Sequence, residues 1–291
     1  MPLGAAGIGE ALVRLGVCEG DAIMVHASLR RMGEVVGGAR TVIEGLIETV
    51  GDPGLIVMPA YTRDAMMPDL PPGLQAEDYE RFEQAVPGFD RAFSSCHQLG
   101  ALAETFRCWP GVVRSCHPIH SITALGPEAR GIVAHHPRDW AFGLDGPMGR
   151  LAELGRTKVL LLGVGWDRCS ALHTAETIAR YRRLRVLRFK DTGREPFRWV
   201  HARDVAEDRE GLFPEVGALL DANPAMRRGA VGSAEARLMP LDDILATASP
   251  WLARSLEDGG GHPSDTVRTD PAGRPRGPQA SARAPRRRAR P

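Results

Sequence analysis

Hydrophobic and polar positions along the chain follow two patterns in turn, one typical of buried strands and one typical of amphipathic helices. Short continuous apolar runs predict strands at residues 23–26, 55–59 and 122–125 and a strand that begins at Val159. Apolar positions spaced three and four apart predict helices at residues 8–15, 40–50, 100–107, 127–135 and 148–154. This alternation predicts an α/β fold, a three-layer α/β/α sandwich around a mixed central sheet.

The C-terminal part continues the alternation. The pattern predicts a hairpin pair at residues 186–189 and 198–201, a helix at 213–222, a strand within 231–238 and a helix at 241–251. Residues 62–92 differ, because they are rich in proline and acidic residues and show no clear periodicity. A segment of this length without periodicity indicates an insertion or lid beside the active site.

The stretch VLLLGVGWDRCSALHTAE at residues 159–176 carries the strongest chemical signal. An apolar run bounded by Gly163 and Gly165 leads into a predicted helix, on which His173 and Glu176 are three positions apart and share a face. A buried strand that delivers a histidine and a carboxylate to one face is typical of an acid/base site. The same spacing also fits a core histidine beside a solvated glutamate, so spacing alone leaves both interpretations open.

Composition and charge narrow the class of protein. The chain has 291 residues, of which 43% are hydrophobic and 25% charged, as is ordinary for a soluble globular protein. With a net charge of +1, no nucleic-acid or membrane partner is expected. The sequence shows neither a membrane-span pattern nor a signal pattern, and its five cysteines lack paired short spacings. We therefore expect a cytoplasmic protein with reduced thiols and no metal site.

The composition changes at Asp258 to glycine, proline, serine and arginine, ending in RAPRRRARP. This change predicts a folded domain at residues 1–257 followed by a disordered tail at 258–291. The arginine cluster suits contact with an acidic surface, and it equally suits a solvated tail. Without these arginines the folded part is acidic, which suits a polycationic substrate.

Four sequence blocks resemble the aminoglycoside 3-N-acetyltransferase (antibiotic N-acetyltransferase) family, in the family's order. GVGWDRCSALHTAE resembles its LLLG-x-G-x-x-x-x-T-x-LH-x-AE signature, and the other blocks are MVHASLRRMGEVVGGARTVIEGLIETVG (24–51), RSCHPIHSITALGPEA (114–129) and GAVGSAEARLMPLDDILATA (229–248). The resemblance spans roughly residues 11–252 and implies the same three-layer fold. It also implies an antibiotic-resistance transferase that uses acetyl-CoA, without a metal, to acetylate the 3-amino group of the 2-deoxystreptamine ring of an aminoglycoside.

An alternative stays open, namely a related acyl-CoA N-acyltransferase that acts on a different amine, such as a peptide or phosphonate metabolite. In either case the expected partners are a small amino-bearing substrate and coenzyme A, and a homodimer is compatible with both. The long segment at residues 62–92 is expected to decide the acceptor.

The resemblance assigns catalytic roles to the histidine and the glutamate. Acetyl transfer requires a base for the attacking amine, and a histidine suits this role because its ordinary pKa of about 6.5 lies near neutral pH. His173 matches the family's histidine and is expected to be this general base. Glu176 is expected to orient the ring or stabilise the imidazolium, as the third member of a catalytic triad does.

Substrate and cofactor residues follow from the same resemblance. Asp64 and Asp204 are expected to bind the amino groups of the substrate, because charge-assisted hydrogen bonds are strong. The residues expected to contact acetyl-CoA are Ser28, Leu29, Arg30, Arg114, Ser115, His120 and Ser121. A surface ion pair for Arg114 and a turn cap for Ser115 are the structural alternatives. Gly146-Pro147-Met148 departs from the family's Ser-Pro and removes one hydroxyl near the expected cofactor site.

Overall fold

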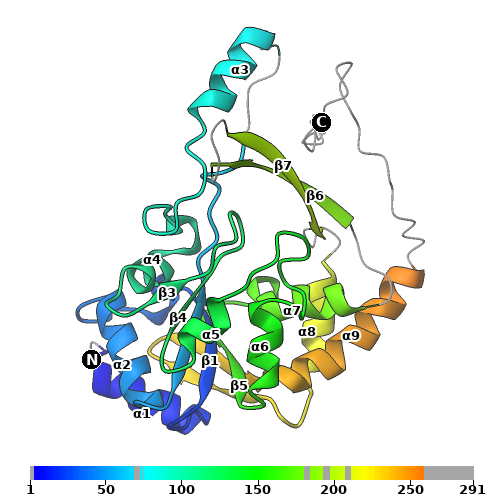
Figure 1. Cartoon of the computed structure of the whole chain (residues 1–291). Coiled ribbons are helices and arrows are strands. Elements are labelled where there is room, and N and C mark those ends of the chain that lie inside the picture. Colours follow the sequence, from blue (N-terminus) through cyan, green and yellow to red (C-terminus); the bar gives the residue numbers. More distant parts are fainter. Residues whose placement is uncertain are drawn as a thin grey trace, which may run out of the picture.

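The computed structural model describes residues 3–68, 73, 75–179, 184–192, 197–206 and 211–258. The strands of its main sheet are β1 (Ala22–Ala27), β2 (Leu55–Pro59), β3 (Val113–Arg114), β4 (Ile122–Leu125), β5 (Thr157–Leu162), β8 (Arg227–Val231) and β9 (Ala234–Pro240). They lie in the order β3-β4-β2-β1-β5-β9-β8, with β1 parallel to β2 and β5 and the other pairs antiparallel (Figure 1). The predicted mixed sheet is confirmed.

Helices cover both faces of this sheet. One face carries α1 (Ala5–Leu15), α2 (Ala39–Val50) and α4 (Ala101–Arg107), and the other carries α5 (Ala129–Val133), α6 (Pro147–Glu153), α7 (Ser170–Ile178), α8 (Leu212–Asp221) and α9 (Leu241–Asp258). Successive side chains of a strand point to opposite faces, so Ile23 and Leu160 enter one core while Met24 and Val159 enter the other. The central strands are buried on both faces, which explains why their sequences are continuous apolar runs. The predicted three-layer sandwich is confirmed.

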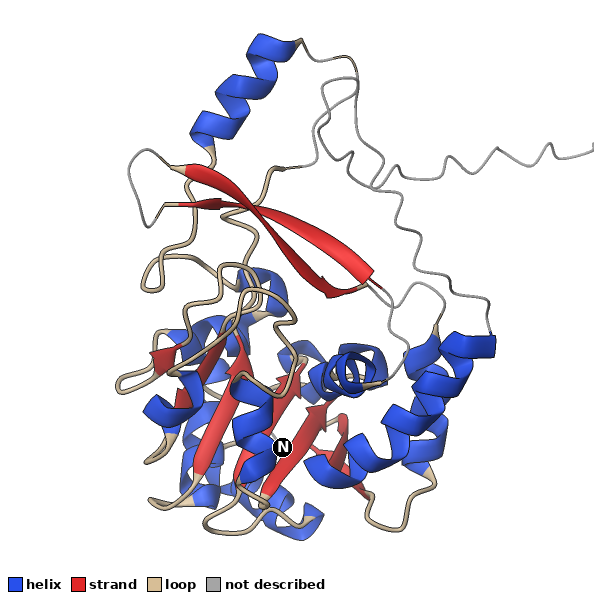
Figure 2. Cartoon of the chain, turned by 45° about the vertical axis from the view of Figure 1, so that its right-hand side comes forward, coloured by secondary structure: helices blue, strands red, loops and turns tan. Residues whose placement is uncertain are grey.

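A separate two-stranded sheet lies above the main sheet (Figure 2). It consists of β6 (Leu184–Asp191) and β7 (Arg198–Val205), paired antiparallel, and both strands are longer than predicted. The segment predicted to lack regular structure contains α3 (Ala76–Ala85), which projects from this sheet (Figure 1). None of its side chains is buried. A helix with so little apolar surface to bury leaves a weak periodic signal, which explains why it was not predicted.

The hairpin holds α3 by its C-terminal end. Lys190 Nζ, on a buried side chain, donates to the carbonyl oxygens of Gln84 at 2.8 Å and Val86 at 2.7 Å. Arg188 on the same strand pairs with Glu83 at 2.5 Å. The insertion is thus attached to β6 by cations placed at the negative end of a helix dipole.

Several boundaries differ from the predicted ones. The strand predicted within residues 231–238 is a hairpin of β8 and β9, turning at Gly232, which has a φ of 61°. Helix α9 continues through Pro250 to Asp258, beyond its predicted end. The predicted tail beyond that residue lies outside the described residues. None of the described helices combines the length and the apolarity that a bilayer crossing requires.

Candidate active site

The candidate site lies where the parallel strands β1, β2 and β5 end. Their carboxyl ends lie at one edge of the sheet, and each is followed by a loop that enters the site. Gly163, directly after β5, has a φ of 64°, and a Cβ there would lie 2.7 Å from the Cβ of Arg31. Only glycine permits this close approach of the β1 and β5 loops, so the glycine of the apolar run has a structural role.

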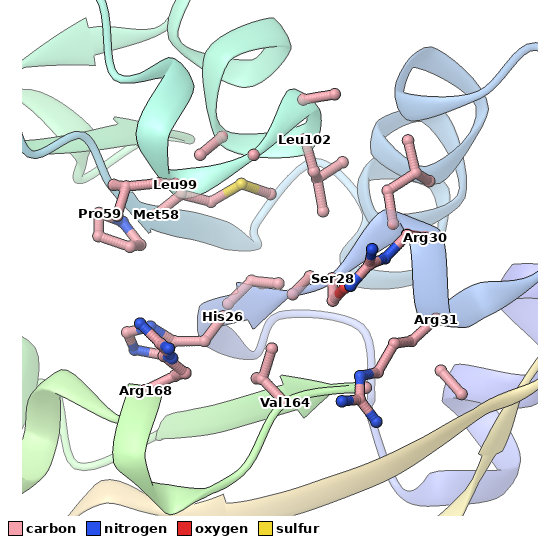
Figure 3. Close-up of a pocket in the computed structure, with 18 of the residues that line it drawn as sticks. His26, Ser28, Arg30, Arg31, Met58, Pro59, Leu99, Leu102, Val164 and Arg168 are labelled. Atoms are coloured by element: carbon pink, nitrogen blue, oxygen red, sulfur yellow. The ribbon is translucent and has the colours of Figure 1, made fainter. Parts of the chain in front are cut away.

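A large cavity of about 1610 Å³ opens at this edge. Figure 3 shows Met58, Pro59, Leu99 and Leu102 along one wall. The opposite side carries polar and cationic side chains, with Arg30 and Arg31 at one end and His26 and Arg168 at the other, and Ser28 between them. The predicted residues Ser28, Leu29 and Arg30 all line this cavity. Such a lining can hold an elongated molecule with anionic groups at one end and an apolar stem.

A smaller cavity of about 250 Å³ adjoins the large one. Of the residues that the structure describes, Tyr61, Gln98, Leu99 and His173 line both cavities. The other described lining residues come from the loop after β2, the loop before β4, the loop between α5 and α6 and the hairpin β6–β7 with the residue that follows it. They are Thr62, Arg63, Met66, Ile119, His120, Phe142, Arg185, Val205 and Ala206. A group held in one cavity therefore meets a group held in the other beside His173.

His173 is held between two aromatic rings. Its ring stacks on Phe142, with centroids 4.9 Å apart and planes 30° apart, and meets the edge or face of Phe213 at 4.8 Å and 64°. Glu176, one turn further along α7, is fully buried. The interpretation of Glu176 as a solvated carboxylate is therefore wrong, because its side chain lies inside the protein. The catalytic roles expected of the pair stay predictions.

Tyr61, Ser170 and His26 form a connected group that the sequence did not reveal. The Tyr61 hydroxyl and Ser170 Oγ are hydrogen-bonded, and the Ser170 backbone N–H donates to His26 Nε2 at 3.4 Å. Burial lowers the pKa of His26 to about 4, so this imidazole is neutral and can accept. The available sequence signal is position, since His26 lies in β1, Tyr61 follows β2 closely and Ser170 begins α7.

His120 and Asp204 form a pair at the smaller cavity. His120 Nδ1 lies 2.9 Å from Asp204 Oδ2, and the other carboxylate oxygen accepts the Val205 N–H at 2.9 Å. The Asp204 side chain is only 1% exposed and lies behind His120, outside the cavity lining. Asp64 is also absent from that lining, although its neighbour Arg63 belongs to it. Direct substrate contacts by Asp64 and Asp204 therefore stay predictions.

Arg114, Ser115 and Ser121 are buried at the two ends of the β3–β4 loop that carries His120, and none of them lines either cavity. Arg114 donates to Ser121 Oγ at 2.9 Å and to the Ala60 carbonyl at 2.6 Å, and burial lowers its pKa to about 10. The surface ion pair considered for Arg114 is therefore wrong. Contacts of these three residues with acetyl-CoA stay predictions.

A network of neutral histidines supports the same loop. Ser115 Oγ bonds His136 Nδ1 at 2.8 Å, and His136 Nε2 donates to the Ala141 carbonyl at 2.9 Å. His117 Nδ1 accepts the N–H groups of Ile119 and His120. These bonds are made by the uncharged rings, and they indicate structural roles. In the described part of the chain, no group of three or more His, Cys, Asp or Glu side chains is placed to hold a metal ion.

Comparison with known proteins identifies the family to which this chain belongs. The family model of aminoglycoside 3-N-acetyltransferases matches residues 24–253. The chain belongs to this family. The resemblance inferred from the four sequence blocks is thus confirmed, and the protein is an aminoglycoside N(3)-acetyltransferase-like acyltransferase.

Individual relatives agree with this assignment over most of the chain. The SPbeta prophage-derived aminoglycoside N(3')-acetyltransferase-like protein YokD of Bacillus subtilis is 33% identical over 249 residues, covering 84% of this chain and 90% of its own. Aminoglycoside N(3)-acetyltransferase VII of Streptomyces paromomycinus is 32% identical over 271 residues, covering 88% and 93%. The crystal structure of YokD superposes with a TM-score of 0.81 at 30% identity, over 90% of this chain and 97% of that chain. A binary complex of AAC-IIIb with CoASH superposes with a TM-score of 0.77 at 30% identity, over 88% and 98%.

Proposed function

We propose that this protein is an acetyl-CoA-dependent N-acetyltransferase that acetylates the 3-amino group of the 2-deoxystreptamine ring of an aminoglycoside, with His173 as general base. The observation that carries the proposal is the junction of the two cavities at His173. A transfer between two substrates requires their reacting atoms to meet at one place, and a base must stand there.

The larger cavity suits acetyl-CoA. Arg30 and Arg31 at one end offer guanidinium groups to phosphates, and Ser28 adds a hydroxyl. The apolar wall that includes Met58 and Leu99 suits a pantetheine arm and leads towards the junction. The similarity to a CoASH-bound relative supports the same assignment. Among the predicted cofactor residues, Ser28, Leu29 and Arg30 are the ones that this cavity supports.

The reaction follows from the groups at the junction. The acceptor amine binds in the smaller cavity, and His173 takes the proton that the nitrogen loses as it attacks the thioester carbonyl carbon. The C–N bond forms, the C–S bond breaks, and the thiolate of coenzyme A leaves and takes up a proton. The aromatic rings of Phe142 and Phe213 restrict the imidazole, and the buried carboxylate of Glu176 stabilises its protonated form.

The charge of the smaller cavity favours a second class of acceptor. Arg63 lines it and is exposed, and no carboxylate is among its described lining residues. Cationic side chains attract an anionic group and repel a polycation. An amine metabolite that also carries a carboxylate or a phosphonate is therefore the second candidate, acetylated by the same chemistry.

Coenzyme A release, measured with a thiol reagent, tests the proposal on the full chain. The acceptor panel combines 2-deoxystreptamine aminoglycosides with amines that bear a carboxylate or a phosphonate. Release with an aminoglycoside, together with an amide at the 3-amino position in the product, is the expected result. Release only with the anionic amines contradicts the aminoglycoside assignment, and no release with any acceptor contradicts the proposed function.

Arg63→Ser serves as the discriminating variant, because Arg63 is exposed at the cavity rim. If the acceptor is polycationic, removal of this positive charge leaves the acceptor KM unchanged or lowers it. If the acceptor is anionic, the same change raises its KM severalfold. The matched control Arg14→Ser lies on α1, away from both cavities, and should change neither constant.

A further inference from the structure

The Tyr61–Ser170 hydroxyl pair lies at the point where the acyl group must react. Tyr61 lines both cavities, as His173 does, and Ser170 lines the larger one. One hydroxyl comes from the loop after β2 and the other from the first residue of α7, 109 positions further along the chain, and the two are hydrogen-bonded to each other. The Tyr61 hydroxyl, the Ser170 hydroxyl and the His173 ring therefore lie around one small region. The proposed general base explains the presence of His173 there, but not that of the two hydroxyls.

We infer that the Tyr61–Ser170 pair is the oxyanion-stabilising donor of the transfer reaction, an inference that rests on the proposed acyl transfer at this junction. When the amine attacks, the carbonyl π electrons move onto oxygen and create a negative charge that needs a hydrogen-bond donor. Tyr61 is placed to donate to this oxygen without transferring its proton. The electron pair then returns to the carbon as the C–S bond breaks.

Proton counting supports the donor role. Each hydroxyl has one proton, so the bond between Tyr61 and Ser170 uses one of the two and leaves the other to donate to a third group. The Ser170 backbone N–H is already directed to His26 Nε2. Burial raises the pKa of the Tyr61 phenol well above its ordinary value, so that the phenol stays protonated at neutral pH.

The surroundings of the pair fix its position and favour negative charge. Ser170 is the first residue of α7, a nine-residue helix whose N-terminal end carries a partial positive charge. The Tyr61 ring is held edge-on by His120 at 5.3 Å and by Phe142 at 5.9 Å. The donor is thus preorganised, which is the condition under which an oxyanion contact contributes to rate.

Tyr61→Phe tests the inference, because it removes the hydroxyl and keeps the ring that contacts His120 and Phe142. We expect kcat to fall by roughly a hundredfold or more, the usual effect of losing one oxyanion donor. The dissociation constant for coenzyme A should stay unchanged, and the melting temperature should fall by only about 2–4 °C, through the lost hydrogen bond to Ser170. Tyr79→Phe on α3, outside both cavities, is the matched control. A Tyr61→Phe kcat within about twofold of wild type would overturn the inference.

A spectroscopic measurement separates a catalytic role from a structural one. Acetyl-CoA labelled with ¹³C at the thioester carbonyl should show a downfield carbonyl shift when bound to the wild type, because a hydrogen bond polarises the carbonyl. The shift should be lost in Tyr61→Phe and weakened in Ser170→Ala. An unchanged shift in both variants contradicts the inference and leaves the proposed function intact. Failure of the wild type to bind acetyl-CoA contradicts the proposed function itself.

Discussion

Because the side chain of His136 is buried, we expect the protein to lose stability in mild acid. The residue is 5% exposed, and its ring bonds Ser115 Oγ and the Ala141 carbonyl as a neutral group. Burial lowers its pKa from the ordinary 6.5 to about 4. Above pH 6.5 the ring is neutral in both the folded and the unfolded state and contributes no pH dependence. Between pH 6.5 and 4 the unfolded chain binds a proton that the folded protein does not.

The size of this stability loss follows from the thermodynamic linkage between proton binding and folding. A difference of two to three pKa units corresponds to a loss of about 3 kcal/mol of unfolding free energy once the pH reaches 4, and about 2 kcal/mol at pH 5. Urea denaturation from pH 8 to pH 4.5 measures this loss. His136→Gln lowers stability at pH 8 through lost hydrogen bonds, but its stability should decline less steeply than that of the wild type as pH falls.

His135→Gln is the matched control, because this neighbouring side chain is exposed and meets solvent in both states. Its unfolding free energy should follow the wild-type pH dependence. Parallel pH profiles for the wild type and His136→Gln would refute the assignment of a proton-linked role to the buried ring. Because His26 is also buried with a pKa lowered to about 4, part of the acid sensitivity should persist in the variant.

Two further substitutions test other parts of the account. Arg30→Gln should raise the KM for acetyl-CoA about tenfold and leave kcat nearly unchanged, because a phosphate contact distant from the junction stabilises the ground state and the transition state alike. Steady-state kinetics with varied acetyl-CoA measure both constants. A loss confined to kcat would contradict this role of Arg30. Lys190→Met removes the cation that bonds the carbonyls at the end of α3. It should lower the unfolding free energy by about 2 kcal/mol and speed tryptic cleavage at Arg81 in α3. An unchanged cleavage rate would show that α3 is held by other contacts.

The sandwich was predictable from the sequence because its central strands leave a strong apolar pattern. Strands β1, β2 and β5 are buried on both faces, so nearly every position in them is apolar, and Leu55–Pro59 was predicted with its observed ends. The strands of β6–β7 were predicted too short, because their burial is mixed and exposed ends such as Leu184 carry little pattern. Helix α3 buries no side chain and was not predicted at all.

The candidate site was only partly predictable for a different reason. Family motifs placed His173 and Ser28 at the cavities, since they lie in contiguous blocks of sequence. Tyr61, in the loop after β2, pairs with Ser170 at the start of α7, and His120 pairs with Asp204 on a distant strand. Such pairings depend on three-dimensional packing, which spacing along the chain does not encode. Motif position also fails to separate a cavity-lining residue from a buried support such as Arg114.

The central claim is that His173 acts as the base where the two cavities meet, and the kcat of His173→Ala tests it most directly. Measured with acetyl-CoA and an accepted amine, kcat should fall by roughly a hundredfold or more. The melting temperature and the affinity for coenzyme A, measured on the same preparation, should change little, because the ring is half-buried and faces the junction. A stable His173→Ala protein with normal kcat at neutral pH would contradict the account.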